Sequence, residues 1–308
     1  MTLRFMRDNT PGDFEKPNAA PETDEQAKDW QEKNRSWWES HPMRYDFGES
    51  THESELTIPF YDEVDRRFLK SIREETPWSS IPFDTFIDFD RLKTESVLEI
   101  GVGCGTHAEL LTRHAGSYTG IDLTSYAVKA TARRLELKSL PGRVLQMDAE
   151  TMSFPDATFD FVWSWGVIHH SSNTRRILAE IARVLKPGGH CTVMVYHTSL
   201  WNTWVRGGLY YGVLRGGFLR TRSVHRLLQE TTDGALARYY TRDEWKAEVD
   251  GLFRVDRTWL LGHRTQLVPL PWGTLKDRIG AMIPGPLGRW ITNRPLFAYM
   301  VVASMTKK

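Results

Sequence analysis

Residues 96–111, SVLEIGVGCGTHAELL, join a short apolar run to a helix-like pattern through three alternating glycines. An apolar run, a glycine cluster and then apolar residues at helical spacing predict a strand, a turn and a helix. Glycines let a ligand approach the backbone closely, and the first amides of a helix are free to bind it. The stretch therefore predicts a binding site for a nucleotide-like ligand.

The spacing of these glycines departs from the two common phosphate-binding patterns. Counted from Gly101, the sixth position of the G-x-G-x-x-G dinucleotide fingerprint holds Thr106, and no Gly-Lys-Ser/Thr follows. Glu99 precedes the first glycine by two residues, where a carboxylate would repel a pyrophosphate but pair with an ammonium group. The expected ligand is an adenosine derivative that carries positive charge and no phosphate.

Two further carboxylates follow predicted strands. Asp122 ends the second strand, where it can accept hydrogen bonds from both ribose hydroxyls, and Asp148 ends the third, where it suits an adenine amino group. Each has an alternative interpretation, because Asp122 can cap the next helix and Asp148 can be a surface turn residue.

Short buried strands alternate with helical patterns through the middle of the chain. This alternation predicts βαβ units and a parallel sheet with right-handed crossovers. The strand candidates are 96–100, 117–123, 143–148, 159–165 and 190–196, and the helical segments include 107–115, 124–139 and 173–187.

Four motifs together resemble a known family. They are VLEIGVGCG (97–105), GIDL (120–123), MDAETMSFPDATFDFVWSWGVIHH (147–170) and LKPGG (185–189). Their order and spacing resemble the class I S-adenosylmethionine (SAM)-dependent methyltransferases of the methyltransferase-11 type, over roughly residues 94–197. The resemblance implies an α/β fold with a Rossmann-like seven-stranded, mostly parallel sheet and an antiparallel last strand, which the run 296–305 matches. It also implies SAM as cofactor and S-adenosylhomocysteine as product.

The resemblance assigns cofactor-binding roles to residues that match the family motifs. It places Glu99, Gly101, Gly103 and Gly105 at the methionine part, Asp122 at the ribose, Leu123 on the adenine, Asp148 and Ala149 at the adenine edge, and Trp165 beside the sulfonium. In similar methyltransferases an N-terminal segment closes over the cofactor, which implies that Tyr45 in WWESHPMRYDF (37–47) reaches it.

The domain organisation follows from composition and periodicity. We expect a flexible tail over residues 1–24, an N-terminal helical lid or lobe over 25–93 and the methyltransferase core over 94–308. Cap insertions are expected at about 198–238 and 265–294, on the carboxyl edge of the sheet, where open α/β folds place their sites.

Methyl transfer from a sulfonium is an in-line displacement, so the protein mainly positions the acceptor and excludes water. A hydroxyl, an amine or an activated carbon can also need a base. The candidates are His169, His170, Tyr196 and His197, at the carboxyl ends of the fourth and fifth strands. We favour His170 and His197, while the alternative is that the two adjacent histidines only order their loop. The His and Cys spacing predicts no metal site.

Charge and composition bear on the acceptor. The 40 Lys and Arg against 39 Asp and Glu give a net charge of +1, so no global field favours nucleic acid. Two separated cysteines and no apolar leader or membrane span predict a cytoplasmic protein with reduced thiols. Aromatic residues flank the core and suit a lipophilic or secondary-metabolite acceptor, methylated at carbon or oxygen. They are Trp37, Trp38, Tyr45, Trp201, Trp204, Tyr210, Tyr211, Trp272 and Trp290.

Alternative functions stay open at this point. One is macromolecular methylation of RNA or protein, against which WSWGVIHH (163–170) lacks the Asn- or Asp-Pro-Pro-aromatic motif usual in amino-methylating nucleic-acid enzymes. Another is a non-methylating SAM-binding protein. Arginines interleave with aromatic and apolar residues in the first cap insertion, which fits either peripheral membrane or lipid contact or a solvated helix face. Oligomerisation is compatible with the sequence. The arginines are Arg206, Arg215, Arg220, Arg222 and Arg226.

Overall fold

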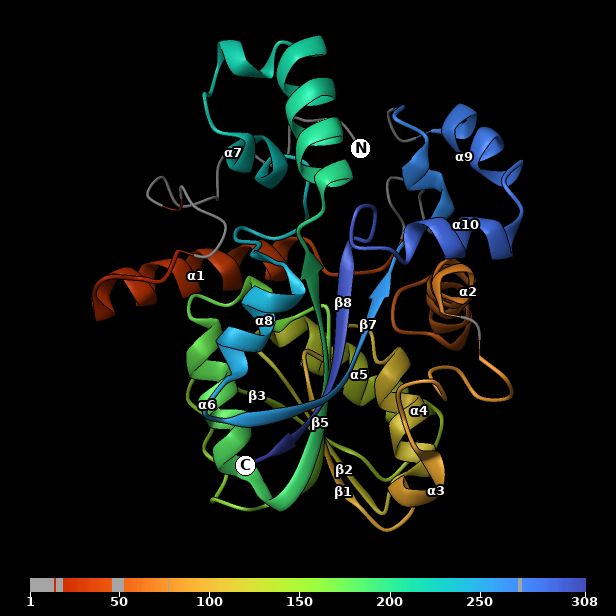
Figure 1. Cartoon of the computed structure of the whole chain (residues 1–308). Helices are drawn as coiled ribbons and strands as arrows, with labels where there is room; N and C mark the ends of the chain where they lie inside the picture. The colour runs from red at the N-terminus through yellow and green to blue at the C-terminus, as the bar shows by residue number, and fades with distance from the viewer. Residues whose placement is uncertain (1–13, 15–18, 46–52, 77, 271–272) are drawn as a thin grey trace.

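A mixed sheet forms the centre of the protein (Figure 1). The computed structural model describes residue 14 and residues 19–45, 53–76, 78–270 and 273–308. The strands lie in the order β3-β2-β1-β4-β5-β8-β7, and β6 pairs with the end of β5. They are β1 (Ser96–Ile100), β2 (Ser117–Asp122), β3 (Arg143–Gln146), β4 (Phe159–Trp165), β5 (Leu185–His197), β6 (Tyr239–Tyr240), β7 (Phe253–Leu261) and β8 (Met300–Lys307).

Strand directions match the Rossmann-like arrangement. Each neighbouring pair from β3 to β5 is parallel, whereas β8 is antiparallel to both β5 and β7. Parallel neighbours need long crossover connections, and helices supply them here. The predicted mostly parallel sheet with an antiparallel last strand is therefore confirmed, and the two-residue β6 is an addition to it.

Different helices cover the two faces of the sheet. Leu98 and Ile100 of β1 pack in one core with Ile177 and Trp245, which belong to α6 and α8. Val97 packs on the other face, in a core that includes residues of α2 and α4. Figure 1 shows α6 and α8 on one side and α3 and α4 on the other. Burial on both faces explains why the strands are continuous apolar runs.

The helices fall into an N-terminal group, a core group and a cap group. The α-helices are α1 (Asp24–Ser40), α2 (Ile58–Glu75), α3 (Phe89–Leu92), α4 (Thr106–His114), α5 (Ser125–Leu137), α6 (Thr174–Val184), α7 (Val224–Gln229), α8 (Arg242–Val249), α9 (Thr274–Ala281) and α10 (Gly285–Thr292). The 3-10 helices are η1 (Ile168–His170), η3 (Gly217–Leu219) and η4 (Arg264–Leu267), and η2 (Trp201–Leu214) is a π-helix.

The N-terminal group contains the two helices that the sequence predicts. Thr23 caps α1 by accepting a hydrogen bond from the Gln26 amide, and α1 ends one residue before His41 and Pro42. The predicted flexible tail over residues 1–24 lies largely outside the described residues and stays a prediction. Phe14, which is described, is buried against Trp30.

Two cap segments leave the sheet at the same edge. Residues 198–238 follow the carboxyl end of β5, and residues 262–299 connect the carboxyl end of β7 to the start of the antiparallel β8. We call these two segments the cap. Figure 1 shows η2, α7, α9 and α10 beyond this end of the sheet. Trp272, an aromatic residue expected to cover the site, lies outside the described residues.

A buried arginine joins α2 to the core. Arg134 of α5 is almost fully buried, and its Nη1 donates to Asp65 Oδ1 of α2 at 3.0 Å. Its Nε donates to Glu109 Oε2 of α4 at 2.9 Å, and its Nη1 also reaches the Cys104 carbonyl at 3.4 Å. One guanidinium therefore connects three helices and the glycine turn.

Replacing Arg134 with Met should lower the free energy of unfolding by about 3 kcal/mol, because it leaves the Asp65 carboxylate without its arginine partner and leaves Glu109 with Arg113 alone. Urea denaturation measures this change. Arg133→Met is the matched control, since Arg133 is exposed and its one ion pair among the described residues is with the exposed Glu136, and it should cost less than about 0.5 kcal/mol. Equal losses in the two variants would contradict the assignment.

Candidate active site

The glycine turn between β1 and α4 is left-handed at three positions. Gly101, Gly103 and Gly105 have φ angles of 83°, 53° and 82°. A Cβ on Gly101 would lie 2.2 Å from Val167 Cγ2, and a Cβ on Gly105 would lie 3.0 Å from Thr131 Oγ1. A Cβ on Gly103 would meet no described atom within 4 Å. Close packing thus requires glycine at positions 101 and 105. The backbone of Gly103 faces open space, where a ligand could approach it.

A buried carboxyl lies beside this turn. Glu99 is 1% exposed, and Tyr118 donates its hydroxyl hydrogen to Glu99 Oε2 at 2.6 Å. Burial raises the pKa of Glu99 to about 8, partly offset by the Tyr118 hydrogen bond. A cationic group bound next to Glu99 would favour the carboxylate. The geometry therefore suits the ammonium-bearing ligand that the sequence predicts.

Asp122, at the end of β2, holds the turn. Its Oδ2 accepts from the Gly103 amide at 3.3 Å, and its Oδ1 accepts from the Thr124 amide and hydroxyl at 2.9 and 2.8 Å. Burial raises the pKa of Asp122, and the hydrogen bonds from Thr124 oppose the rise. The N-cap residue of α5 is Thr124, whose side chain accepts from the Ala127 amide. Asp122 therefore is not the helix cap that the alternative interpretation required.

The next site residues contact α1. Asp148 Oδ1 accepts from Gln31 Nε2 at 2.9 Å and from the Glu150 amide at 2.8 Å. Leu123 follows Asp122 directly and is half-buried, and Ala149 is buried. The predicted adenosine residues are thus together at the carboxyl ends of β2 and β3.

Helix α1 also contacts the start of α5. The Glu39 carboxylate accepts from the Ser125 amide and hydroxyl at 2.8 and 2.6 Å, and from the Tyr126 amide at 3.1 Å. The side-chain oxygen Oε1 of Gln31 accepts from the Ser172 amide at 3.1 Å. Sequence reasoning missed Gln31 and Glu39, because no local pattern marks polar contacts between positions about a hundred residues apart.

Aromatic side chains gather next to the turn. Trp165 is the last residue of β4 and stacks on Trp163 with ring centroids 5.4 Å apart, and Phe83 contacts its edge at 5.1 Å. Tyr45 stacks on Phe68 at 4.7 Å. The cofactor contacts of Trp165 and Tyr45 stay predictions.

Sequence reasoning also missed His107, in the first turn of α4. Its ring lies among Phe68, Phe83, Trp163 and Trp165, and neither ring nitrogen has a hydrogen-bond partner among the described residues. Burial lowers the pKa of His107 to about 3, so the imidazole is neutral at pH 7. Its position immediately after the glycine turn was the sequence feature that could have marked it as a site residue.

Three of the four candidate bases lie together. The ring centroids of His169 and Tyr196 are 4.0 Å apart, and those of His170 and Tyr196 are 5.5 Å apart. His197 is separate, because neighbouring strand residues point to opposite faces, and its Nδ1 donates to the Ala298 carbonyl at 3.2 Å. The structure therefore groups His169, His170 and Tyr196 without His197.

His170 has a defined tautomer. Its Nδ1 lies 2.6 Å from the Leu236 carbonyl, and since a carbonyl only accepts, Nδ1 carries the proton. Burial lowers the pKa of His170 to about 4 despite this hydrogen bond. Nε2 is buried and has no partner among the described residues. At pH 7 it therefore carries an unshared lone pair, the protonation state that a general base requires, although the lowered pKa makes it a weaker base than a free imidazole.

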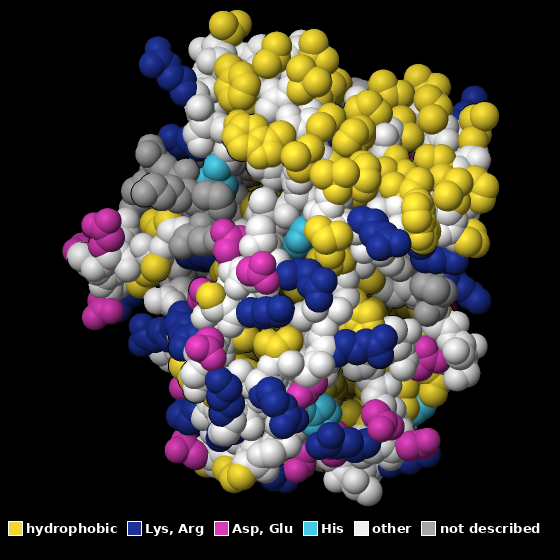
Figure 2. Space-filling model, in the orientation of Figure 1, with side chains coloured by type: hydrophobic (Ala, Val, Ile, Leu, Met, Phe, Trp, Pro, Cys, Tyr) yellow, Lys and Arg dark blue, Asp and Glu magenta, His cyan; other side chains and the backbone are white. Residues whose placement is uncertain are grey.

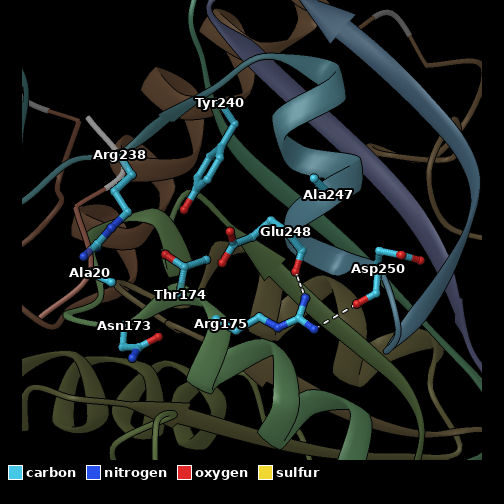
Figure 3. A pocket seen from close by; sticks show the side chains of 9 residues that line it. All are labelled: Ala20, Asn173, Thr174, Arg175, Arg238, Tyr240, Ala247, Glu248 and Asp250. Atoms are coloured by element: carbon cyan, nitrogen blue, oxygen red, sulfur yellow. Dashed lines mark hydrogen bonds between the residues drawn. The ribbon is translucent and has the colours of Figure 1, made fainter. Parts of the chain in front are cut away.

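A hollow of about 430 Å³ lies away from these residues (Figure 3). It is lined by α6, α8 and the buried Arg238. Arg238 donates to the carbonyls of Ala19 at 2.8 Å and Ser172 at 2.6 Å, and also to that of Ser171. Arg175 donates to the Asp250 carbonyl at 2.8 Å. These guanidinium groups hold backbone segments together, and no predicted site residue lines this hollow.

The comparisons with known proteins identify the family. Residues 98–193 match the family described as "Methyltransferase domain". The chain is 31% identical over 144 residues to an uncharacterized methyltransferase of Mycobacterium bovis, an alignment that covers 44% of this chain and 72% of that protein. The chain belongs to the class I SAM-dependent methyltransferases. Its cofactor is SAM, and the buried Glu99 beside an open glycine backbone fits that cationic ligand.

Two further similarities concern substrate and fold. The methyltransferase is 41% identical over 98 residues to a phthiotriol/phenolphthiotriol dimycocerosates methyltransferase of Mycobacterium tuberculosis, covering 31% of this chain and only 36% of that relative. Its fold is similar to a geranyl diphosphate C-methyltransferase from Streptomyces coelicolor, with a TM-score of 0.55, 14% identity, and coverage of 94% of this chain and 100% of that one. That structure contains S-adenosylhomocysteine.

The affinity of the methyltransferase for S-adenosylhomocysteine should increase as the pH rises from 6 to 8. Below its raised pKa of about 8, Glu99 is protonated, and it must lose that proton to pair with the ligand ammonium. Loss of this one proton can increase the affinity by at most about tenfold per pH unit. Calorimetric titration of wild type and Glu99→Gln measures the effect. The variant has no titratable group at position 99, so any pH dependence that it retains comes from the ligand. Equal pH profiles would contradict the role of Glu99.

Proposed function

We propose that this methyltransferase transfers the methyl group of SAM to carbon or oxygen of a small lipophilic acceptor, bound where β4 and β5 end beneath α1. The main supporting observation is the buried Nε2 of His170, which lies within an aromatic wall and has no hydrogen-bond partner among the described residues. Trp38 of α1 contacts the His170 ring at 5.1 Å, and Tyr196 and Tyr239 stack at 5.5 Å. Such a lining suits an apolar or planar acceptor with one proton to lose.

Cofactor residues would lie next to this wall. Val167 packs on Gly101 and directly precedes η1, which carries His169 and His170. We assign the methionine part of SAM to Glu99 and the glycine turn, the ribose to Asp122, and the adenine to Leu123, Asp148 and Ala149. The methyl donor then lies between the turn and η1, on the same side as the proposed base.

The chemistry needs little from the protein beyond placement. In an in-line displacement the sulfur–methyl bond breaks as the acceptor–methyl bond forms, and the acceptor proton passes to Nε2 of His170. The hydrogen bond from Nδ1 to the Leu236 carbonyl stabilises the imidazolium that forms. Buried aromatic side chains exclude water, which would otherwise solvate the acceptor.

The names of two similar proteins support an acceptor rich in hydrocarbon. One names a phthiotriol dimycocerosate and the other geranyl diphosphate, with methylation at carbon stated for the second. The first match covers only 31% of this chain, so the proposal rests mainly on the aromatic lining.

Incubating the protein with methyl-labelled SAM and a fractionated cell extract tests the acceptor class. We expect the label in the organic-soluble, low-molecular-weight fraction. Label confined to RNA or protein would overturn the proposal in favour of macromolecular methylation. Asp122→Ala, which removes the proposed ribose ligand, serves as the cofactor-binding control and should abolish the label.

Replacing His170 with Asn should reduce methyl transfer to that acceptor about 100-fold or more, the usual contribution of a general base. The Asn amide can still donate to the Leu236 carbonyl, while Nε2 is lost. His197→Asn is the matched control, since His197 Nδ1 also donates to a backbone carbonyl but on the other face. Initial rates and the melting shift with S-adenosylhomocysteine are measured together. Equal rates in both variants would reject a base role for His170.

A further inference from the structure

Helix η2 in the cap has an inverted distribution of side chains. Several of its apolar residues, together with Leu200 directly before it, are exposed at intervals of four and five positions, which follows the wide i→i+5 winding of this helix. Trp204 is 61% exposed and Leu214 68%, whereas Gly207, Gly208 and Gly212 face the protein. A surface helix ordinarily buries its apolar side and exposes its polar side. The exposed residues are Leu200, Trp204, Leu209, Val213 and Leu214.

Helices α9 and α10 repeat this inversion. Their inward positions are Lys276 and Gly280 in α9, and Gly288 and Thr292 in α10. Their outward positions include large apolar side chains, and Met282, which follows α9, is 81% exposed. Three separate helices therefore present apolar side chains to the outside. The exposed residues here are Leu275, Ile279, Met282, Leu287 and Trp290.

These residues form one face. Figure 2 shows a broad hydrophobic area over the end of the molecule where Figure 1 draws η2, α9 and α10. Among the described residues, the large hydrophobic side chains that are exposed all belong to residues 200–219 and 275–296. We call this area the cap face. Contiguous exposed apolar surface of this kind marks an interaction site.

Charge on the cap is opposite to charge on the rest of the chain. Residues 198–238 and 262–299 contain eleven Lys and Arg but three Asp and Glu, while the remainder contains 29 Lys and Arg and 36 Asp and Glu. Arg215, Arg222 and Arg278 are exposed and form no ion pair with any described residue. The Arg294 guanidinium lies 5.1 Å from the Trp290 ring. The cap face is therefore apolar, aromatic and basic.

We propose that the cap face docks on the surface of an anionic lipid bilayer. Apolar and Trp side chains on short helices enter the interface, while arginines pair with lipid headgroups. A second copy of this chain is a poorer occupant, because a two-fold contact would bring the basic caps together. None of the helices in the described part of the chain is long and apolar enough to cross a bilayer.

Docking would place the carboxyl edge of the sheet toward the lipid. The cap segments start at the carboxyl edge of the sheet, which also carries the glycine turn and η1. An acceptor dissolved in the bilayer would therefore reach the enzyme without crossing water. The docking itself does not depend on which acceptor is used.

Vesicle flotation with the full-length protein tests the proposal. We expect at least tenfold tighter binding to phosphatidylcholine vesicles containing 30% phosphatidylglycerol than to phosphatidylcholine alone, weakened by added salt, since each basic side chain contributes electrostatic attraction. Absence of binding to the anionic vesicles would overturn the proposal. So would salt-independent binding to both vesicle types.

Two sets of variants locate the contact. Changing Trp204, Leu214, Met282 and Trp290 to Gln should reduce vesicle binding at least tenfold while leaving the melting shift with S-adenosylhomocysteine intact. Arg215→Gln, Arg222→Gln and Arg278→Gln together should remove the preference for anionic lipid. The matched control changes three exposed basic residues outside the cap, Arg133, Lys246 and Arg254, to Gln and should bind as wild type. Equal losses in the control, or a wild-type dimer that the four Gln changes dissociate, would contradict membrane docking.

An environment-sensitive fluorophore gives a direct readout. Both native cysteines are buried, so a new surface cysteine can be labelled selectively. A label at Leu209→Cys should shift to shorter wavelength when anionic vesicles are added, whereas one at Lys129→Cys on the exposed side of α5 should not. Identical responses at the two positions would reject the cap face as the contact.

Discussion

The left-handed turn between β1 and α4 is the constraint on which the site depends. Its outer glycines leave no room for a Cβ, because Val167 fills the space beside Gly101 and Thr131 the space beside Gly105. The turn is thereby fixed between α5 and the loop that follows β4. The Gly103 amide donates a hydrogen bond to Asp122. The loop that carries His170 starts from the same contact, so cofactor cradle and proposed base share one rigid support.

Polar contacts over long sequence separations set the position of the N-terminal helices. Gln31 and Glu39 attach α1 to Asp148 and to the start of α5, while Arg134 attaches α2 to α4 and α5. Arg238 joins Ala19 to the segment after η1. The N-terminal helices are therefore held by hydrogen bonds to the same elements that would bind the cofactor.

The cap and the core differ in which side chains they bury. Inside the sheet layers, apolar side chains face inward and contribute hydrophobic stabilisation. In η2, α9 and α10 glycine and polar residues face inward, and apolar residues face out. The cap therefore leaves apolar side chains exposed that the core would bury, which is the basis of the proposed membrane contact.

The sequence by itself determined the local elements and the cofactor chemistry. Strand and helix periodicities and the glycine turn depend on residues a few positions apart, so the order of β and α elements and the places of Glu99 and Asp122 could be predicted. The tertiary structure alone decided which distant groups meet. His170 and His197 were equivalent candidates in the sequence, and the alternation of side chains along β5 separates His197 from Tyr196 and its neighbours. Gln31 and Glu39 left no distinctive local pattern, because packing between segments far apart in the chain creates their environments.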